Sequence, residues 1–289
     1  MHLTALRAAG DRQALGRPET TNSSGDFMRI RSLLAIALLV ASPAAGQTGF
    51  LDRSVNLHGQ TYRYQVYVPS DYTSARAWPV IVSLHGNGRQ GGDGMLQTGT
   101  DFAIRIRQNR APFPAIVVFP QAQVGTRWAD TEMQDLVIAA ADQAIAEWHA
   151  DPARVYLHGY SMGGSGSYRI AYKWPTRFAA IVIVAGRVVP AAPNTPAEID
   201  RDRRANPFLT APDPFALLAE RIKRVPIWIF HGDADESVPV TESRQLVLAL
   251  KTVAAQVRYT EYPAVDHNVA PQKAYDDSEL FAWLFAQHR

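Results

Sequence analysis

The stretch that decides the fold is residues 153–164, which read ARVYLHGYSMGG. An apolar, β-favouring run ends in Gly-Tyr-Ser-Met-Gly and is followed by residues that can begin a helix, which is the context in which G-x-S-x-G forms a nucleophile elbow. Gly159 and Gly163 leave room for a tight turn that holds the hydroxyl of Ser161 out of the sheet. An ordinary glycine-rich turn between a strand and a helix fits the same motif, so the rest of the chain must supply the partners that a catalytic serine needs.

Segments rich in Val and Ile alternate with helical patterns along the chain. This alternation predicts an α/β fold with a doubly wound, mostly parallel sheet, and the runs 50–56 and 61–68 predict an N-terminal antiparallel hairpin. At 131–148 apolar residues recur at helical spacing, and Thr131 and Gln134 are spaced as in a capping box. Further strands are expected at 78–84, 115–119, 178–185, 226–230 and 256–262, and further helices at 100–108, 167–173, 242–254 and 277–287.

The first 46 residues read as an N-terminal extension followed by an export signal. Basic residues precede an apolar run at 33–40, and small residues follow it. That run is far shorter than the ~18 residues of a membrane span, so no stable membrane insertion is expected. The signal is expected at about 28–46, with 1–27 as a polar extension unless translation begins at Met28. The sequence therefore predicts a secreted or periplasmic protein.

Composition bounds the function of residues 47–289, which we expect to form a single catalytic domain. The chain has 29 Lys and Arg against 27 Asp and Glu, and the excess lies in the first 46 residues, which hold five Arg and three acids. The remainder is neutral, which gives no reason to expect a nucleic-acid partner. With no cysteine, no H-E-x-x-H motif and no spaced histidine cluster, neither a metal site nor a cofactor is expected. The oligomeric state is not indicated.

A serine nucleophile needs a histidine base and a carboxylate that orients the base. Sheet proteins of this type carry them after later strands, in the order Ser, acid, His. His267 follows the last predicted strand and is the only histidine that lies in the required place, while Asp266 beside it is poorly placed to reach its ring. Three carboxylates follow the strand at 226–230, namely Asp233, Asp235 and Glu236.

Two other segments are candidates for the surroundings of the site. The glycine-rich loop 85–94 follows a buried strand and could bring backbone N–H groups close to a ligand, although a flexible surface loop has the same composition. Residues 187–212 are rich in Pro and charge and are too long for a typical connection, so we expect a cap or lid, with a disordered excursion as the alternative. Trp128 is a candidate pocket wall or a core tryptophan, and Asn268 is a candidate substrate-binding residue.

Together these motifs resemble the α/β-hydrolase superfamily. More closely, the chain is similar to the secreted carboxylesterases known as predicted peptidases, which are related to dienelactone hydrolases and to the prolyl oligopeptidase catalytic domain. The similarity extends over roughly residues 60–289, in the stretches 83–86, 91–94, 113–121, 158–164, 231–239, 262–268 and 279–287.

The resemblance implies site residues. It assigns the acid to Asp235, four residues after the His of His-Gly-x-x-Asp-x-x-Val-Pro, and the oxyanion donors to the backbone N–H groups of Met162 and Asn87. The chain departs from its relatives at Ala270, where they often carry Trp, and in the long connection 187–212. Both departures lie where substrate would bind, so the substrate range of the relatives does not transfer.

The sequence therefore predicts a serine hydrolase that cleaves carboxylic esters through Ser161, His267 and Asp235 and an acyl-serine intermediate. Expected substrates are small-molecule or polymer-linked esters, such as feruloyl or acetyl esters. Two alternatives stay open: a serine peptidase that acts on small peptides, and a non-catalytic relative that binds carbohydrate or lipid.

Overall fold

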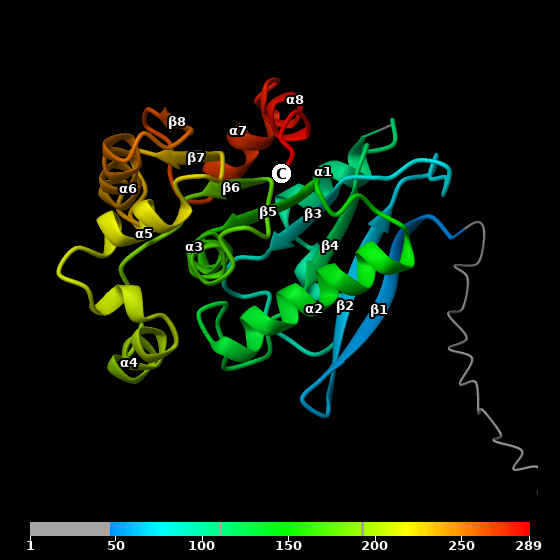
Figure 1. Ribbon diagram of the computed structural model, residues 1–289, viewed down its shortest axis with the longest axis horizontal. Coiled ribbons are helices and arrows are strands. Elements are labelled where there is room, and N and C mark those ends of the chain that lie inside the picture. Colours follow the sequence, from blue (N-terminus) through cyan, green and yellow to red (C-terminus); the bar gives the residue numbers. More distant parts are fainter. Residues whose placement is uncertain (1–46, 110, 192–193) are drawn as a thin grey trace, which may run out of the picture. The chain divides into compact units, whose positions relative to one another are not determined.

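The computed structural model describes residues 47–109, 111–191 and 194–289, so the predicted export signal lies outside the described residues. Eight strands form one sheet in the order β1-β2-β4-β3-β5-β6-β7-β8 (Figure 1). The strands are β1 (Gly49–Leu57), β2 (Gln60–Val68), β3 (Val80–Leu84), β4 (Ile116–Pro120), β5 (Val155–Tyr160), β6 (Ala180–Val184), β7 (Ile227–Gly232) and β8 (Val257–Tyr262).

The sheet is mostly parallel and begins with the predicted hairpin. β2 runs antiparallel to both β1 and β4, and the pairings from β4 through β8 are parallel. Every residue of β3, β4 and β6 is buried. Parallel strands covered on both faces are near-continuous apolar runs, which is why the sequence shows them without alternation.

Helices cover both faces of the sheet and enclose two hydrophobic clusters. One cluster includes buried residues of α2, α3, α5 and α6, and the other includes buried residues of α1, α7 and α8. The helices are α1 (Asp101–Gln108), α2 (Thr131–Glu147), α3 (Met162–Lys173), α4 (Pro196–Ala205), α5 (Pro214–Ile222), α6 (Thr241–Thr252), α7 (Ala270–Asp276) and α8 (Leu280–Phe285), with 3-10 turns η1 (Leu96–Thr98) and η2 (Pro207–Thr210). This three-layer arrangement is the α/β-hydrolase fold expected from the sequence.

The cap of α2 differs from the expected one. Asp130 is the N-cap residue, Thr131 is already helical, and the side chain of Asp130 does not cap the helix. Its carboxylate instead accepts the Arg127 N–H at 2.8 Å and pairs with Arg201 at 2.6 Å. The Gln134 side chain turns to the Ala129 carbonyl, so tertiary contacts replace the predicted capping box.

The described part of segment 187–212 carries α4 and η2, neither of which the sequence pattern indicated. Arg169 of α3 anchors it: its guanidinium pairs with Asp202 of α4 at 2.6 Å, and both side chains are almost completely buried. The same guanidinium donates to the carbonyls of Arg187 and Val188. The segment is therefore attached to the helix that follows the elbow.

Among the described residues, no helix combines the length and the apolar character that crossing a membrane requires.

Candidate active site

Ser161 lies in the turn between β5 and α3, where the sequence placed the elbow. Its backbone has φ 55° and ψ −116°, a conformation that is unfavourable for a residue with a side chain. The turn is held because the Ser161 N–H donates to the Val184 carbonyl and the Ser161 carbonyl accepts from the Ser165 N–H, both at 2.9 Å. The hydroxyl of Ser161 thus lies at the carboxyl edge of the sheet, in the wall of a cavity.

The two glycines of the motif allow backbone segments to touch. A Cβ at Gly159 would lie 2.2 Å from the Gly163 carbonyl oxygen, and a Cβ at Gly163 would lie 2.0 Å from the carbonyl oxygen of Leu84. Any larger residue would push the start of α3 away from the ends of β5 and β3. The glycines therefore place the nucleophile beside the loop that follows β3.

The structure brings Ser161, His267 and Asp235 together. The Nε2 atom of His267 lies 2.7 Å from the Ser161 Oγ, and its Nδ1 atom lies 2.6 Å from Asp235 Oδ2. Asp235 follows β7 and His267 follows β8, and all three side chains meet because parallel strands end at the same edge of the sheet. With Nδ1 donating to the carboxylate, Nε2 is free to accept the serine proton.

Asp235 is buried and holds several hydrogen bonds. Oδ1 accepts the N–H groups of Ser237 and Val238 at 2.8 and 2.7 Å, while Oδ2 accepts from His231 as well as from His267. Burial alone raises the pKa of this carboxyl, but the bonds from His231, His267 and the Val238 N–H outweigh it and hold the pKa well below its usual range. Asp235 is therefore a carboxylate throughout the ordinary pH range.

His231 is a second histidine of this network, and the sequence reasoning did not assign it a role. It is completely buried, with Nδ1 2.7 Å from Ser243 Oγ and Nε2 3.1 Å from Asp235 Oδ2 and 2.9 Å from the Val238 carbonyl. A carboxylate and a carbonyl can only accept, so His231 Nε2 carries a proton and donates to them. The sequence feature that could have indicated this role is the position of His231 four residues before Asp235.

The two residues predicted to supply oxyanion donors line the same cavity as Ser161. Met162 is the first residue of α3, so its N–H has no acceptor within the helix. Asn87 lies in the loop after β3 and, like Met162, lines the cavity that holds Ser161. Gln90 braces this loop, donating to Asn87 Oδ1 at 2.9 Å and accepting from the Gly88 N–H at 2.8 Å. Both residues thus line the cavity that contains Ser161, and their role as oxyanion donors stays a prediction.

The two candidate substrate residues have different surroundings. Trp128 is completely buried, donates from Nε1 to the His85 carbonyl at 3.0 Å and packs on Gly166, but it is not part of the cavity wall. The structure therefore corresponds to the core alternative for Trp128, where it supports the strand end before the glycine-rich loop. Asn268, in contrast, lines the cavity beside His267.

Two other histidines at strand ends are part of the core. Burial, partly opposed by a bond to the Gly86 carbonyl, lowers the pKa of His85 to about 4, and burial lowers the pKa of His158 to about 3. His158 lies between the hydroxyls of Ser83 and Tyr275, at 2.9 and 3.0 Å. Both rings are therefore neutral structural groups.

The cavity has a volume of about 620 Å³, which is in the range of small-molecule sites. One wall includes parts of the 187–212 segment, among them Pro190, Asn194 and Asp202. Tyr160 also belongs to the lining, and its hydroxyl donates to the His267 carbonyl at 3.0 Å, which fixes the loop that carries the histidine. Within the described ranges, no group of three or more His, Asp or Glu side chains is arranged to hold a metal ion.

Comparisons with known proteins agree with this geometry. The model of the prolyl oligopeptidase family matches residues 121–288. The probable feruloyl esterase C of Aspergillus niger is 26% identical over 168 residues, covering 55% of this chain and 61% of the relative. The acetylxylan esterase A of Emericella nidulans is 26% identical over 233 residues, or 72% of each protein. The chain thus spans about three fifths of the length of the feruloyl esterase that it matches.

Solved structures give the same picture of the fold. A thermostable esterase superposes with a TM-score of 0.63 at 27% identity, over 83% of this chain and 63% of that one. Apo Thermogutta terrifontis esterase 2 gives 0.59 at 18% identity, over 82% and 96%. Pyrococcus horikoshii acylaminoacyl peptidase gives 0.60 at 15% identity, over 82% and 41%. The last two similarities show the shared fold alone.

Proposed function

Because the chain belongs to the prolyl oligopeptidase family of serine esterases and peptidases, we propose that it hydrolyses carboxylic esters through an acyl-serine formed at Ser161. The observation that carries the proposal is the continuous hydrogen-bonded chain Ser161, His267, Asp235, with the serine facing a cavity. A serine that contacts a histidine, which in turn contacts a buried carboxylate, has the geometry of an activated nucleophile.

In the proposed reaction, His267 Nε2 takes the proton of Ser161 while Oγ attacks the ester carbonyl. Asp235 holds the ring in the required tautomer and stabilises the imidazolium that forms. The N–H groups of Met162 and Asn87 would bind the negative charge that develops on the carbonyl oxygen. The imidazolium then protonates the leaving alcohol, and a water molecule activated by the same histidine releases the acid from Ser161.

An ester is preferred to an amide on the basis of the relatives. The curated relatives with the quoted matches are feruloyl and acetylxylan esterases, and the structure that superposes at 27% identity is an esterase. We therefore propose feruloyl or acetyl esters, free or linked to a polymer, as the substrate class. A peptidase acting on small peptides is the second candidate, because the family includes peptidases and an acylaminoacyl peptidase shares the fold.

We also propose that residues 47–289 act as one catalytic domain and that the protein is secreted or periplasmic, with its export signal at about 28–46. Segment 187–212 would serve as a cap, since part of it lines the cavity. No nucleic-acid partner and no metal or cofactor form part of the proposal.

Substitution of the serine tests the assignment. We expect Ser161→Ala to reduce turnover of 4-nitrophenyl acetate and methyl ferulate by at least about a thousandfold and to abolish labelling by a fluorophosphonate, because both reactions need the nucleophile. Ser54→Ala, an exposed serine on β1, is the matched control and should behave as the wild type. Wild-type esterase turnover in Ser161→Ala would contradict the proposal, and an unlabelled wild-type protein would favour the non-catalytic alternative.

Matched leaving groups separate the two enzymatic candidates. An esterase is expected to cleave 4-nitrophenyl esters far faster than a 4-nitroanilide or a short peptide amide with the same acyl group, because an amide nitrogen is the poorer leaving group. Comparable kcat/KM values for ester and amide would instead indicate a peptidase.

A further inference from the structure

Arginines gather in the wall of the cavity that contains Ser161. They come from four separate parts of the chain, and two acidic residues share the lining. The six residues are Arg89, Arg127, Arg169, Arg187, Asp101 and Asp202.

Two of these guanidinium groups have acidic partners within the protein. Arg169 is saturated by Asp202 and by backbone carbonyls, and it is almost completely buried. Arg127 donates from Nε to Glu198 at 3.0 Å. Bonds from the Thr195 N–H and from Arg127 lower the pKa of Glu198 to about 2, so this partner is fully ionised. Both guanidinium groups therefore stabilise the cavity wall through contacts within the protein and are not available to bind a ligand.

Arg89 is different. It lies two residues after Asn87 in the loop that borders the nucleophile, its residue is exposed, and none of the ion pairs among the described residues includes it. A Cβ on Gly99 would lie 3.4 Å from Arg89 Nη1 and 3.5 Å from its Cζ, so the guanidinium rests against the bare backbone at Gly99. No ion pair joins it to Asp101 in the same lining, although both residues are within the described part of the chain.

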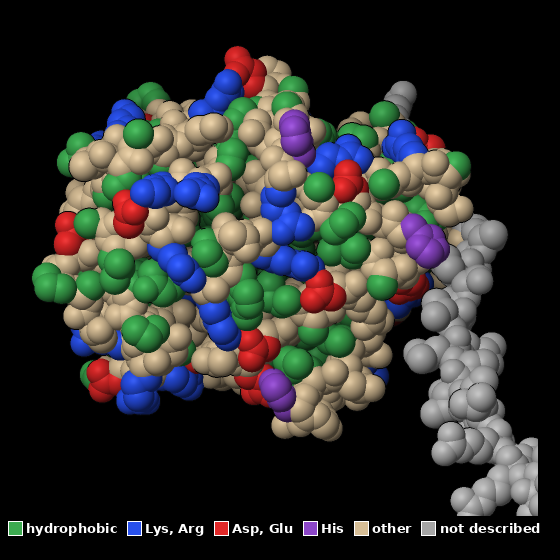
Figure 2. Space-filling view, viewed as in Figure 1, with side chains coloured by type: hydrophobic (Ala, Val, Ile, Leu, Met, Phe, Trp, Pro, Cys, Tyr) green, Lys and Arg blue, Asp and Glu red, His purple; other side chains and the backbone are tan. Residues whose placement is uncertain are grey.

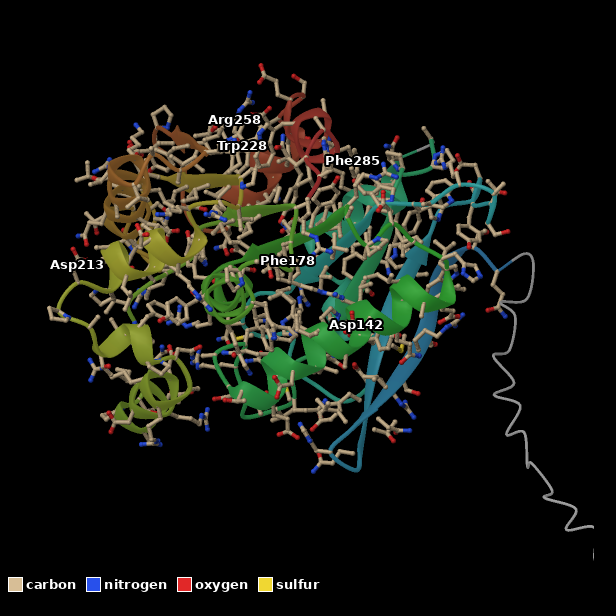
Figure 3. The ribbon with its side chains drawn as sticks, viewed as in Figure 1. Asp142, Phe178, Asp213, Trp228, Arg258 and Phe285 are labelled. Carbon is tan, nitrogen blue, oxygen red and sulfur yellow. The ribbon has the colours of Figure 1, made fainter. Side chains whose placement is uncertain are left out.

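Some cations elsewhere on the surface have counter-ions, whereas the exposed Arg203, Arg204 and Arg224 take part in no ion pair among the described residues. Figure 2 shows a face whose centre carries Lys and Arg side chains, with Asp and Glu side chains beside some of them. Asp142, labelled in Figure 3, pairs with Arg177. Arg258, also labelled there, pairs with Glu279 at 3.0 Å and lies 4.8 Å from the ring centre of Trp228. The feature that sets Arg89 apart from the other unpaired cations is its place in the wall of the reaction cavity, beside the loop that carries Asn87.

We infer that the ester which this site cleaves carries a carboxylate, and that Arg89 binds it. The inference rests on the proposed esterase function. A guanidinium presents paired N–H donors that match the two oxygens of a carboxylate, whereas a neutral ester leaves them without a partner. Because Arg89 and Asn87 share one short loop, binding of the anion would also fix the scissile carbonyl relative to the oxyanion donor. The carboxylate can belong to the acyl group, as in a half-ester of a dicarboxylic acid, or to the alcohol, as in a uronic acid.

Two pairs of chromogenic esters test the inference with the full chain. The acyl pair is 4-nitrophenyl hydrogen adipate and 4-nitrophenyl hexanoate, and the alcohol pair is 3-carboxy-4-nitrophenyl acetate and 4-nitrophenyl acetate. In at least one pair, the wild type is expected to have a kcat/KM about tenfold or more higher for the charged ester, after correction for spontaneous hydrolysis. This preference should decline as salt is raised from about 0.05 to about 0.5 M.

Variants assign the preference to the residue. Arg89→Gln is expected to lower the charged-to-neutral ratio of kcat/KM to near one, and Arg89→Lys to retain part of it, because Lys keeps the charge without the planar fork. Arg224→Gln makes the same change of net charge at an exposed arginine outside the cavity lining and should keep the wild-type ratio.

The outcomes separate this inference from the function on which it rests. A wild type that hydrolyses the neutral esters and shows no preference for the charged ester in either pair overturns the inference and leaves the esterase proposal standing. A preference that Arg89→Gln retains in full overturns the inference in the same way. A wild type that cleaves none of the four esters and is not labelled by a fluorophosphonate overturns the proposed function itself.

Discussion

At the scale of single residues, the site depends on close approach of backbone segments around Ser161. The positive φ of this serine costs on the order of 1–3 kcal/mol and persists only because its surroundings enforce it. Gly163 is one cause, since its missing side chain lets α3 contact the end of β3. The strain and the bare glycine together place the serine within reach of His267.

The importance of this contact can be measured with Gly163→Ala. A Cβ there would lie 2.0 Å from the Leu84 carbonyl oxygen, so the start of α3 and the loop after β3 must move apart. We expect a loss of about 1–3 kcal/mol in the free energy of unfolding and at least about a hundredfold loss of kcat with 4-nitrophenyl acetate. Gly92→Ala is the control, because a Cβ at Gly92 makes only an ordinary contact of 3.5 Å with Gln123. Equal kcat in both variants would contradict this account.

His231 is a positioning residue for the acid, because its Nε2–H holds the Asp235 oxygen that also contacts His267. His231→Gln should lower kcat about ten- to a hundredfold with little change in KM, because binding of the ester does not involve this residue. Ser243→Ala removes the hydroxyl that contacts His231 Nδ1, so the ring is held less firmly. This variant should show a smaller fall in kcat than His231→Gln.

The rate of fluorophosphonate labelling should fall in parallel with kcat in the His231 variant. If the His231 variant has a Tm several degrees lower but keeps the wild-type kcat at 25 °C, His231 contributes to stability alone.

At the scale of elements, α4 is attached to the body of the protein by a buried ion pair. Thr195 and Glu198 form a capping box at its start, and Asp202 on the same helix pairs with Arg169 of α3. The residue before α3 is the candidate nucleophile, so one helix connects the serine to the proposed cap. This arrangement makes the position of the cap depend on an interaction that is shielded from water.

Removal of Asp202 tests that dependence. Asp202→Ala leaves the Arg169 guanidinium buried without its acid, which typically destabilises a protein by about 3–5 kcal/mol. Urea unfolding followed by circular dichroism gives the free energy of unfolding. The control is Glu279→Gln, which removes the exposed partner of Arg258 and should change stability by less than about 1 kcal/mol. A similarly small change in Asp202→Ala would show that the pair does not hold the segment.

At the scale of the whole molecule, the core encloses two neutral histidines, one in β5 and one directly after β3. The folded-state pKa values of His85 and His158, about 4 and about 3, both lie below the 6.5 of a free histidine. Between pH 6.5 and 4 these two histidines are therefore protonated in the unfolded chain and remain neutral in the folded protein. The contribution of these histidines to the free energy of unfolding is complete above about pH 6.5. It is lost as the pH falls toward their pKa values in the folded state.

This linkage predicts a measurable pH dependence. At about pH 5 each buried histidine should lower the free energy of unfolding by roughly 2 kcal/mol relative to about pH 7.5. His158→Gln should reduce the difference between the two pH values by about that amount, whatever its effect at the higher pH. His288→Gln, an exposed histidine near the C-terminus, should leave the difference unchanged. An identical pH dependence in the wild type and in His158→Gln would rule out this origin.

Local patterns were enough to predict most of the architecture. The parallel strands are apolar runs because both of their faces are buried, and the alternation with helices predicted the sheet and its N-terminal hairpin. The candidate triad could also be predicted from the sequence, because the order Ser161, acid, His267 follows from the order of the strands that carry these residues. The proposed export signal stays a prediction from the sequence.

Other features depend on contacts between distant segments, which no local pattern encodes. Thr131 is already helical and the Gln134 side chain bonds to the Ala129 carbonyl and to Asn206, so the predicted capping box of Thr131 and Gln134 does not form. Trp128 lies beneath the glycine-rich loop rather than in the cavity wall.

The sequence by itself determined which residue types were available for catalysis and in what order the strands present them, since both are properties of the chain. Only the tertiary structure decided which charges are neutralised. Arg169 meets Asp202 from 33 residues away, whereas Arg89 meets no acid among the described residues. Whether a charge is compensated depends on distance and burial in the folded protein, and these arise only when segments distant in the sequence pack together.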